Sequence, residues 1–379
     1  MPGNELIGKE ELNEIKQIFT KSGGVLFAHA FDKRRKNIFR VRIFENLLSK
    51  HFKSNHVQCV SSGTAAIKIG LKALGVKSGD EVITQAFNFI ATIEAILDIG
   101  AVPIITNIDD TLNMCPKDLK KKITKKTKAV VPVHMLGFAA DMKEIKKICK
   151  IKKIPILEDN CESVGAKLDG QFLGTLGDVG VFSFDFGKNI TTGEGGAILT
   201  NNKKYFQYSK EYHDHGHQLN PKFPRGMDTV SIFGFNYRMT EMQGAVGIAQ
   251  IKKINYIMKE NKKRYTSLED LISTRFEIRK CIHGSTPSYD TFLFKVENEN
   301  HRKQIIKYLV NQGIGTKNVP DAIKWHFASY WKHALKKSEI ISIKESSRKI
   351  KEYIAIPILL KTKIKTYYKI GEFIKNTNF

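Results

Sequence analysis

Residues 182–197 read Phe-Ser-Phe-Asp-Phe-Gly-Lys-Asn-Ile-Thr-Thr-Gly-Glu-Gly-Gly-Ala and form the most informative stretch of the chain. An apolar, strand-like run comes first, a glycine-rich turn follows, and Lys188 lies between them. A lysine that is held in a partly buried pocket can have a lowered pKa and act as a nucleophile toward a carbonyl. Taken alone, Lys188 is one of many lysines, so its role depends on what the rest of the sequence places beside it.

Upstream of Lys188, short apolar runs alternate with helix-like patterns, which is typical of βαβ units. The runs that predict strands are 56–60, 81–84, 102–107, 129–133, 154–158, 179–184 and 197–200. Helical patterns lie between several of them, over 63–74, 89–99 and 141–150. The alternation predicts an α/β fold in which helices cover both faces of a mostly parallel, seven-stranded sheet.

A different pattern begins near residue 240 and predicts a second, smaller domain. Residues 240–261 have the spacing of a long helix, 291–296 are strand-like, and 302–312 are helix-like. We therefore expect an N-terminal arm and a large domain within residues 1–240, and a small α+β domain over residues 241–379.

Two segments outside the Lys188 turn could bind parts of a cofactor. Residues 61–66 read Ser-Ser-Gly-Thr-Ala-Ala. They follow a strand and open a helix, where free N–H groups favour an anion, although they could serve only as a cap. Asp159 ends the fifth strand, so its carboxylate could pair with a protonated ring nitrogen or cap the next helix. A phosphate cradle, a carboxylate and a lysine together meet the needs of pyridoxal phosphate (PLP).

Because these residues occur in this order along the sequence, the chain resembles the DegT/DnrJ/EryC1/StrS family of sugar aminotransferases, which has the aspartate-aminotransferase (type I) PLP fold. The resemblance runs nearly end to end through Ser62-Gly63-Thr64-Ala65-Ala66, Gly79-Asp80-Glu81-Val82-Ile83, Gly100-Ala101-Val102-Pro103, Thr127-Lys128-Ala129, Pro132-Val133-His134, Glu158-Asp159, Gly177-Asp178-Val179-Gly180, Ser183-Phe184 with Lys188, Gly193-Glu194-Gly195-Gly196 and Gly234-Phe235-Asn236-Tyr237-Arg238-Met239. It implies PLP as the cofactor, pyridoxamine phosphate as its intermediate form, and a homodimer with active sites at the subunit interface.

The resemblance also implies a role for each matching residue. Lys188 would form the Schiff base with PLP and move the proton, and Asp159 would keep the pyridine nitrogen protonated. The cofactor would also be bound by the backbone of Gly63 and Thr64, the Ser183 hydroxyl, the stacked ring of Phe89, and Asn236 of the neighbouring subunit. Arg238 would line the same shared cleft. Without the resemblance, Phe89 could equally be a core residue and residues 236–238 an ordinary polar loop.

Glu162 departs from the family pattern, which usually has a glutamine three residues after the pyridine-binding aspartate, in contact with the cofactor's phenolic oxygen. The segment Asp159-Asn160-Cys161-Glu162-Ser163 is more similar to the dehydratase branch, which removes a 3-hydroxyl from ketodeoxysugars. That branch, however, replaces the lysine with histidine, whereas this chain has Lys188. Because a transaminase needs the covalent anchor, Lys188 outweighs Glu162.

Three further segments resemble the 8-amino-3,8-dideoxy-octulosonate aminotransferase subgroup, which aminates the C8 aldehyde of an oxidised lipopolysaccharide-core sugar. They are Met1-Pro2-Gly3 with Glu5, His213-Asp214-His215-Gly216-His217, and Trp325-His326 with Trp331-Lys332-His333. Sugars stack on indole faces and need many hydrogen-bond donors, so we expect His215, Trp325 and His326 to bind substrate. The histidine cluster could also suit a metal, but it lacks a partner set of carboxylate or cysteine ligands, so we expect no metal.

The amino-acid composition limits the functional classes to which this protein can belong. The 379 residues include 62 Lys and Arg against 38 Asp and Glu, a net charge of +24, which a nucleic-acid-binding protein could have. The lysines are spread along the chain without a nucleic-acid-binding motif, so we expect a solvated basic surface and no nucleic-acid partner. No apolar run is long enough for membrane insertion, and five cysteines without C-x-x-C spacing suit a reducing cytoplasm.

The sequence therefore predicts a PLP-dependent aminotransferase that acts on a small-molecule sugar and an amino acid. It would move an amino group from glutamate or glutamine to a keto- or aldehydo-sugar, nucleotide-linked or an octulosonate, for surface polysaccharide. A PLP- or pyridoxamine phosphate-dependent 3-dehydratase of a ketodeoxysugar is the alternative that Glu162 supports. A basic polyanion-binding protein is a remote alternative that only the net charge supports.

Overall fold

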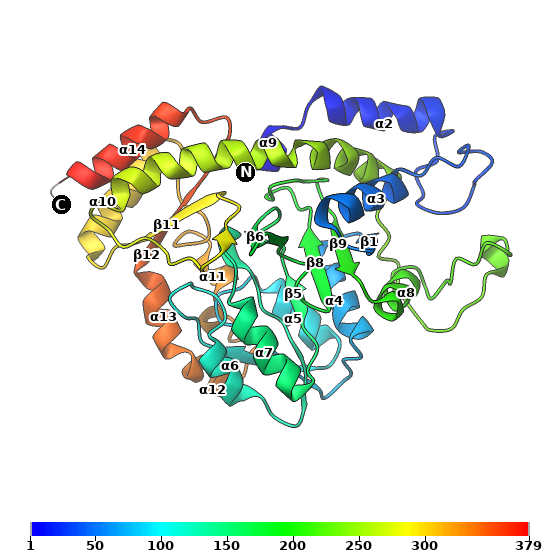
Figure 1. The fold of residues 1–379 in the computed structure, drawn as a ribbon, viewed down its shortest axis with the longest axis horizontal. Helices are drawn as coiled ribbons and strands as arrows, with labels where there is room; N and C mark the ends of the chain where they lie inside the picture. The colour runs from blue at the N-terminus through cyan, green and yellow to red at the C-terminus, as the bar shows by residue number, and fades with distance from the viewer. Residues whose placement is uncertain (1, 378–379) are drawn as a thin grey trace.

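The computed structural model describes residues 2–377, so Met1, Asn378 and Phe379, which the motif and domain ranges above include, lie outside the described residues. One long helix, α9 (Glu241–Ile272), runs along one side of the molecule, and most of the strands lie beneath it (Figure 1). None of the described helices combines the length and the apolar character that crossing a bilayer requires.

Seven strands form two sheets at the centre. The four-stranded sheet has the order β1 (His56–Val60), β9 (Gly196–Thr200), β8 (Val179–Ser183) and β5 (Leu157–Asp159). The three-stranded sheet has the order β3 (Val102–Thr106), β2 (Glu81–Gln85) and β4 (Thr127–Val130). Strand β9 is antiparallel to both of its neighbours, whereas the other pairs are parallel. The predicted strands are therefore confirmed, and most of them are parallel.

The expectation of one continuous seven-stranded sheet is wrong. Among the residues that the structure describes, the two sheets are connected by isolated parallel bridges between Val130 and Ile156 and between Val133 and Asp159, without a continuous ladder. Pro132 and Pro155 lie beside these bridges and have no N–H group to donate, so a regular hydrogen-bond ladder cannot form there. The seam still brings the end of β5 next to residues 133 and 134.

Helices cover both faces of the four-stranded sheet because alternate strand residues point in opposite directions. Val181 and Ile198 pack in the same core as α4 (Gly63–Ala73) and α5 (Ala91–Asp98). Phe182 and Ala197 pack in a second core with α3 (Arg40–Phe52) and the first part of α9. The other helices and short strands before α9 are α1 (Pro2–Glu5), α2 (Lys9–Lys21), α6 (Pro116–Lys122), η1 (Met135–Gly137), α7 (Met142–Lys152), β6 (Lys167–Leu168), β7 (Gln171–Phe172), α8 (Lys203–Tyr212) and η2 (Arg225–Met227).

Helix α9 begins where the sequence predicts it but continues eleven residues beyond 261, to Ile272. Thr240 caps it, since its hydroxyl accepts from the Gln243 N–H at 3.4 Å while the Gln243 side chain accepts from the Thr240 N–H at 2.8 Å. It packs against α2 and α3 at one end and against α14 (Ile364–Asn376) at the other. The domain boundary at residue 240 stays a prediction.

The rest of the chain is mixed α and β. Strands β11 (Thr291–Lys295) and β12 (Tyr353–Pro357) pair antiparallel. Short strand β10 (Ser285–Thr286) pairs with β6, and the remaining helices are α10 (Glu299–Asn311), α11 (Ile323–His326), η3 (Ala328–Tyr330), α12 (Lys337–Ser342) and α13 (Lys344–Lys351). Residues 317–319 contact Ala355 of β12 through backbone hydrogen bonds, which fixes the loop before α11.

Candidate active site

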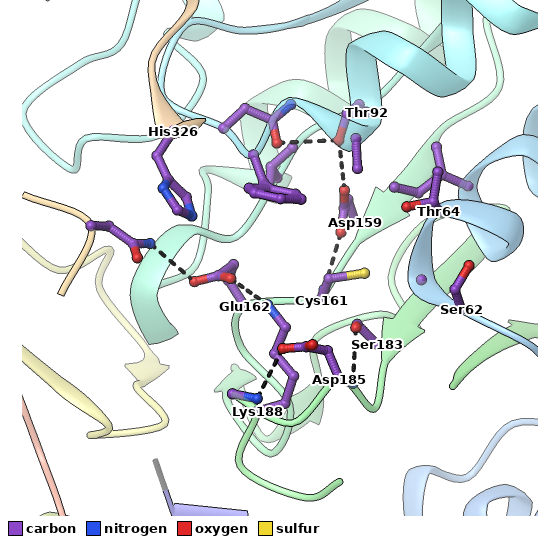
Figure 2. A pocket seen from close by; sticks show the side chains of 18 of the residues that line it. Ser62, Thr64, Thr92, Asp159, Cys161, Glu162, Ser183, Asp185, Lys188 and His326 are labelled. Atoms are coloured by element: carbon purple, nitrogen blue, oxygen red, sulfur yellow. Dashed lines mark hydrogen bonds and ion pairs between the residues drawn. The ribbon is translucent and has the colours of Figure 1, made fainter. Parts of the chain in front are cut away.

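One cavity gathers most of the predicted functional residues (Figure 2). The start of α4, the ends of β5 and β8, the turn after β8, and the segment 317–326 that ends in α11 contribute side chains to it. The predicted site residues that line it are Gly63, Thr64, Phe89, Asp159, Glu162, Ser183, Lys188 and His326. The structure thus brings these residues around one space, and their roles in the site remain predictions.

The start of α4 offers an anion site at one end of the cavity. Ser62 caps the helix, with its hydroxyl accepting from the Ala65 N–H at 3.1 Å. The first N–H groups of a helix have no acceptor within it, and the helix dipole favours negative charge there. A Cβ atom on Gly63 would lie 2.9 Å from Ser183 Cβ, so glycine is what allows the Ser183 hydroxyl to approach the helix start.

Asp159 lies on the opposite side, at the end of β5, and is 2% exposed. Its carboxylate accepts from the Thr92 hydroxyl at 3.1 Å and from the Cys161 N–H at 3.1 Å. Burial raises its pKa, which means that an ionised Asp159 would be stabilised by a cationic partner inside the cavity. The neighbouring Glu158 turns away and binds His134 and three backbone N–H groups, so it has a structural position.

Lys188 and Glu162 form a partly buried ion pair inside the cavity, and Figure 2 shows their charged ends pointing toward each other. Burial opposes the charged form of Lys188, but the charges of Glu162, Cys161 and Asp185, together with the hydrogen bond to Glu162, outweigh it and raise the pKa of Lys188. Burial alone would raise the pKa of Glu162, yet the charges of Lys188, Lys317 and His326 lower it to about 2. The sequence suggested a lowered pKa for Lys188, and without a bound cofactor the ion pair reverses that expectation.

Aromatic and polar side chains close the cavity beyond Lys188. Phe89 precedes α5 instead of lying within it, is 42% exposed, and its ring centre is 5.1 Å from that of His326. A partly exposed ring at a cavity wall can stack on a planar ligand, so the interpretation of Phe89 as a core residue is wrong. Burial lowers the pKa of His326, which favours the neutral ring.

The other predicted site residues do not line this cavity. Arg238 donates to Asp214 at 2.6 Å, and Asn236 forms a backbone bridge with Asp214. His215 is exposed, and Trp325 is 60% exposed outside the cavity. The histidine cluster also points in different directions, because His213 contacts Gln58 while His217 lies 3.3 Å from Asp228. Among residues 2–377 no group of three potential ligands is arranged to hold a metal ion.

The sequence reasoning missed several lining residues, among them Thr92, Cys161, Asp185, Lys317 and Asn318. Asn318 donates to Glu162 at 3.5 Å, and Lys317 pairs with Asp290 at 2.6 Å. Lys317 and Asn318 are far from Lys188 in sequence and lie in no motif, so only the fold reveals them. Cys161 could have been found, since it lies between Asp159 and Glu162.

The residues of the cavity fit PLP in this chain. The gap that a Gly63 side chain would fill, the buried carboxylate of Asp159 and the amine of Lys188 supply the three contacts that PLP needs. Gly63, Thr64 and Ser183 would hold the phosphate, Asp159 the ring nitrogen and Phe89 the ring face.

Comparisons with known proteins agree with this geometry. The model of the DegT/DnrJ/EryC1/StrS aminotransferase family matches residues 35–375. The GDP-perosamine synthase of Vibrio cholerae is 32% identical over 277 residues, which are 72% of this chain and 74% of that protein. An aminotransferase structure from Psychrobacter cryohalolentis superposes with a TM-score of 0.85 at 23% identity, covering 97% of both chains.

A second solved structure, the E. coli GDP-4-keto-6-deoxy-D-mannose-3-dehydratase with bound hydrated PLP, superposes with a TM-score of 0.82 at 23% identity. It covers 99% of this chain and 98% of that chain. These likenesses confirm the type I PLP fold, and the family match extends over most of the sequence. The chain therefore belongs to the DegT/DnrJ/EryC1/StrS aminotransferase family, a family of PLP-dependent sugar aminotransferases.

Proposed function

We propose that this chain transfers an amino group from glutamate or glutamine to the carbonyl of a keto- or aldehydo-sugar that is used for surface polysaccharide. The observation that carries the proposal is the presence of Lys188 in the same cavity as Asp159. Lysine is the residue that can both anchor the cofactor aldehyde and exchange a proton with the substrate carbon.

Bound PLP supplies an aldehyde and an electron-withdrawing ring, and the chain's own residues then orient the reaction. Asp159 holds the proton on the ring nitrogen, because its buried carboxylate favours a cationic partner. Lys188 Nζ would accept and return the proton of the substrate carbon. Glu162 lies against the same amine, so it controls whether that amine is charged.

The proposed dehydratase alternative depends on Glu162 alone. A dehydratase must leave the substrate carbon without a new amine, whereas an aminotransferase must deliver one. Lys188 supports the second outcome, since the resemblance links the dehydratase branch to a histidine at this position. Mass spectrometry of the product distinguishes the two, because amination keeps the neighbouring hydroxyl and dehydration removes it.

We also propose that two copies of the chain share their active sites. Asn236 and Arg238 do not line the cavity of their own chain. Residues that act in the partner's site are expected to lie outside their own. The preceding loop exposes large apolar side chains, with Met227 and Phe233 each 71% exposed and Val230 59% exposed. Such exposed apolar residues are typical of a surface that a second protein covers.

Subunit mixing tests the shared site. A Lys188→Ala chain and an Asn236→Ala, Arg238→Ala chain should each be nearly inactive as homodimers. Random pairing gives about half heterodimers, each with one intact site, so about a quarter of the wild-type activity should return. If native mass spectrometry confirms heterodimers and no activity returns, the Asn236 loop serves its own chain.

The most specific part of the proposal is the identity of the sugar substrate. The similarity to the octulosonate subgroup favours an aldehyde at C8, and His326 lines the cavity where a sugar would enter. Trp325, which lies outside the cavity and is exposed, would need the partner subunit to bring it into the site. A panel of keto- and aldehydo-sugars, with glutamate as donor, tests the choice, and turnover of the octulosonate aldehyde alone would support the subgroup.

A further inference from the structure

The segment Pro2–Lys21, called the arm below, comprises α1 and α2 and lies along α9 (Figure 1). Its residues Gly3 and Glu5 belong to a motif that has no part in the chemistry proposed above. The structure nevertheless places Gly3 and the adjacent Asn4 against residues 186–191, called the lysine turn below, which carry Lys188.

The arm contacts the lysine turn directly at two carbonyl groups. The Gly3 N–H donates to the Lys188 carbonyl at 3.1 Å, and the Asn4 side chain donates to the Phe186 carbonyl at 3.2 Å. Gly3 is buried, and a Cβ atom on it would lie 2.7 Å from the Lys188 oxygen and 3.0 Å from the Thr191 nitrogen. These neighbours are backbone atoms, so any side chain at position 3 must displace either the arm or the turn.

A second, indirect contact holds the far end of the lysine turn. Gln250 of α9 accepts from the Thr191 N–H at 3.2 Å and donates to Glu11 of the arm at 2.8 Å. Lys253 donates to the same Glu11 oxygen at 2.6 Å. All of these hydrogen bonds are buried or partly buried, where such bonds are directional and costly to leave unmade. The turn is therefore held at both ends.

The arm also contacts the segment that follows β12. The Glu5 carboxylate accepts from the Leu360 N–H at 2.8 Å and from the Lys361 N–H at 3.0 Å. These residues follow β12, whose Ala355 carbonyl accepts from the Lys317 N–H at 2.9 Å. One short segment thus joins the turn that carries Lys188 to the strand that supports Lys317.

We propose that the arm is a positioning element for Lys188, with Gly3 and Asn4 as positioning residues that fix the backbone of the lysine turn. The proposal depends on the proposed role of Lys188 for its chemical meaning, but not for its structural test. A backbone shift of about 1 Å at a reacting group can cost on the order of a hundredfold in rate. An intact arm keeps the Lys188 amine at its place beside Glu162.

Gly3→Ala and Asn4→Ala test the proposal, with Gly8→Ala as the matched control. Gly8 lies on the same arm, but a Cβ atom there would come no closer than 3.7 Å to a neighbour, the Glu10 side chain. Hydrogen–deuterium exchange of the PLP-free protein is the first readout. We expect exchange in residues 186–191 to become about tenfold faster in both test variants and to stay unchanged in the control.

The PLP-loaded protein gives the second readout, which a loss of overall stability would not reproduce. The pH at which the visible absorption of the Lys188-bound cofactor changes should shift in Gly3→Ala and Asn4→Ala. The kcat should fall about tenfold, while KM for the amino donor should change by less than about twofold.

The outcomes separate the two proposals. Unchanged exchange in the lysine turn, or faster exchange spread evenly over the whole chain, overturns the positioning role. If Gly3→Ala does not fold, Asn4→Ala decides by the same criteria. If exchange rises in the turn but borohydride labels a lysine other than Lys188 in the wild type, the arm positions the turn and the proposed function fails.

Discussion

Glu162→Gln is the substitution whose result follows most directly from the electrostatics of the cavity. Glu162 is paired with Lys188 and accepts a hydrogen bond from Asn318 at 3.5 Å. Glutamine keeps the shape and an acceptor oxygen but removes the negative charge that holds the Lys188 amine protonated. Burial lowers the pKa of Lys188, and nearby negative charge raises it. Once the charge of Glu162 is removed, less negative charge remains to counteract burial, so the pKa of Lys188 should fall.

The pKa of Glu162 gives the size of the effect. It lies at about 2 instead of 4.5, which corresponds to a net stabilisation of the carboxylate by roughly 3 kcal/mol after the opposing cost of burial. Lys188 makes the largest favourable contribution, and Lys317 and His326 contribute less. We therefore expect the pKa of Lys188 to fall by about one to two pH units in the variant. Because the folded pKa of Glu162 is lowered, the stabilisation by this pair is present above about pH 4.5 and is lost as the pH falls toward 2.

Borohydride trapping measures the change. PLP is added to the cofactor-free protein over a range of pH, the covalent link is reduced, and peptide mapping gives the labelled fraction of Lys188. The midpoint of the pH profile should lie about one to two units lower in Glu162→Gln than in the wild type. Glu194→Gln is the control, because Glu194 lines the same cavity and is exposed. Superimposable profiles for Glu162→Gln and the wild type would refute the reasoning.

Three further substitutions test other parts of the site and fold. Asp159→Asn should lower kcat about a hundredfold or more, since a charge-assisted hydrogen bond in a desolvated site is lost, and steady-state kinetics within a few-fold of wild type would exclude the role. Gly63→Ala should weaken PLP binding about tenfold in equilibrium dialysis, because its Cβ would lie 2.9 Å from Ser183 Cβ, and unchanged affinity would contradict the phosphate cradle. Burial raises the pKa of Glu45 from 4.5 to about 8, so the wild-type free energy of unfolding should decrease as the pH rises through this range. Urea titrations at a series of pH values measure this decrease. Glu45→Gln should lack that decrease, and an equal slope in both proteins would show that Glu45 is not responsible.

The sequence predicts the strands and their order along the chain well, because short apolar runs between turn residues are a local signal. It fails at the seam between β4 and β5, where the effect of Pro132 and Pro155 depends on which strands become neighbours. It also ends α9 too early at Asn261. That residue is buried and donates to the Ser288 carbonyl, so a polar side chain on the buried face has its partner far along the chain.

For the site as well, the sequence predicts the residues that lie in local motifs and misses those that depend on contacts between distant segments. Lys188, Asp159 and Ser183 lie in motifs whose residue types already indicate their chemistry, and the cavity contains all three. Lys317 and Asn318 reach the cavity only because their loop bonds to β12. The lowered pKa expected for Lys188 was wrong for the cofactor-free protein, because the pattern around Lys188 says nothing about where the charge of Glu162 lies.

The transfer of nitrogen from donor to sugar is the most direct measure of the central claim. The PLP-loaded protein is incubated with nitrogen-15-labelled glutamate and a keto- or aldehydo-sugar, and the sugar product is analysed by mass spectrometry. Our account predicts a sugar that carries the labelled amine and keeps its neighbouring hydroxyl, with transfer abolished in Lys188→Ala. A product that has lost water and contains no labelled nitrogen would contradict the account and identify a dehydratase.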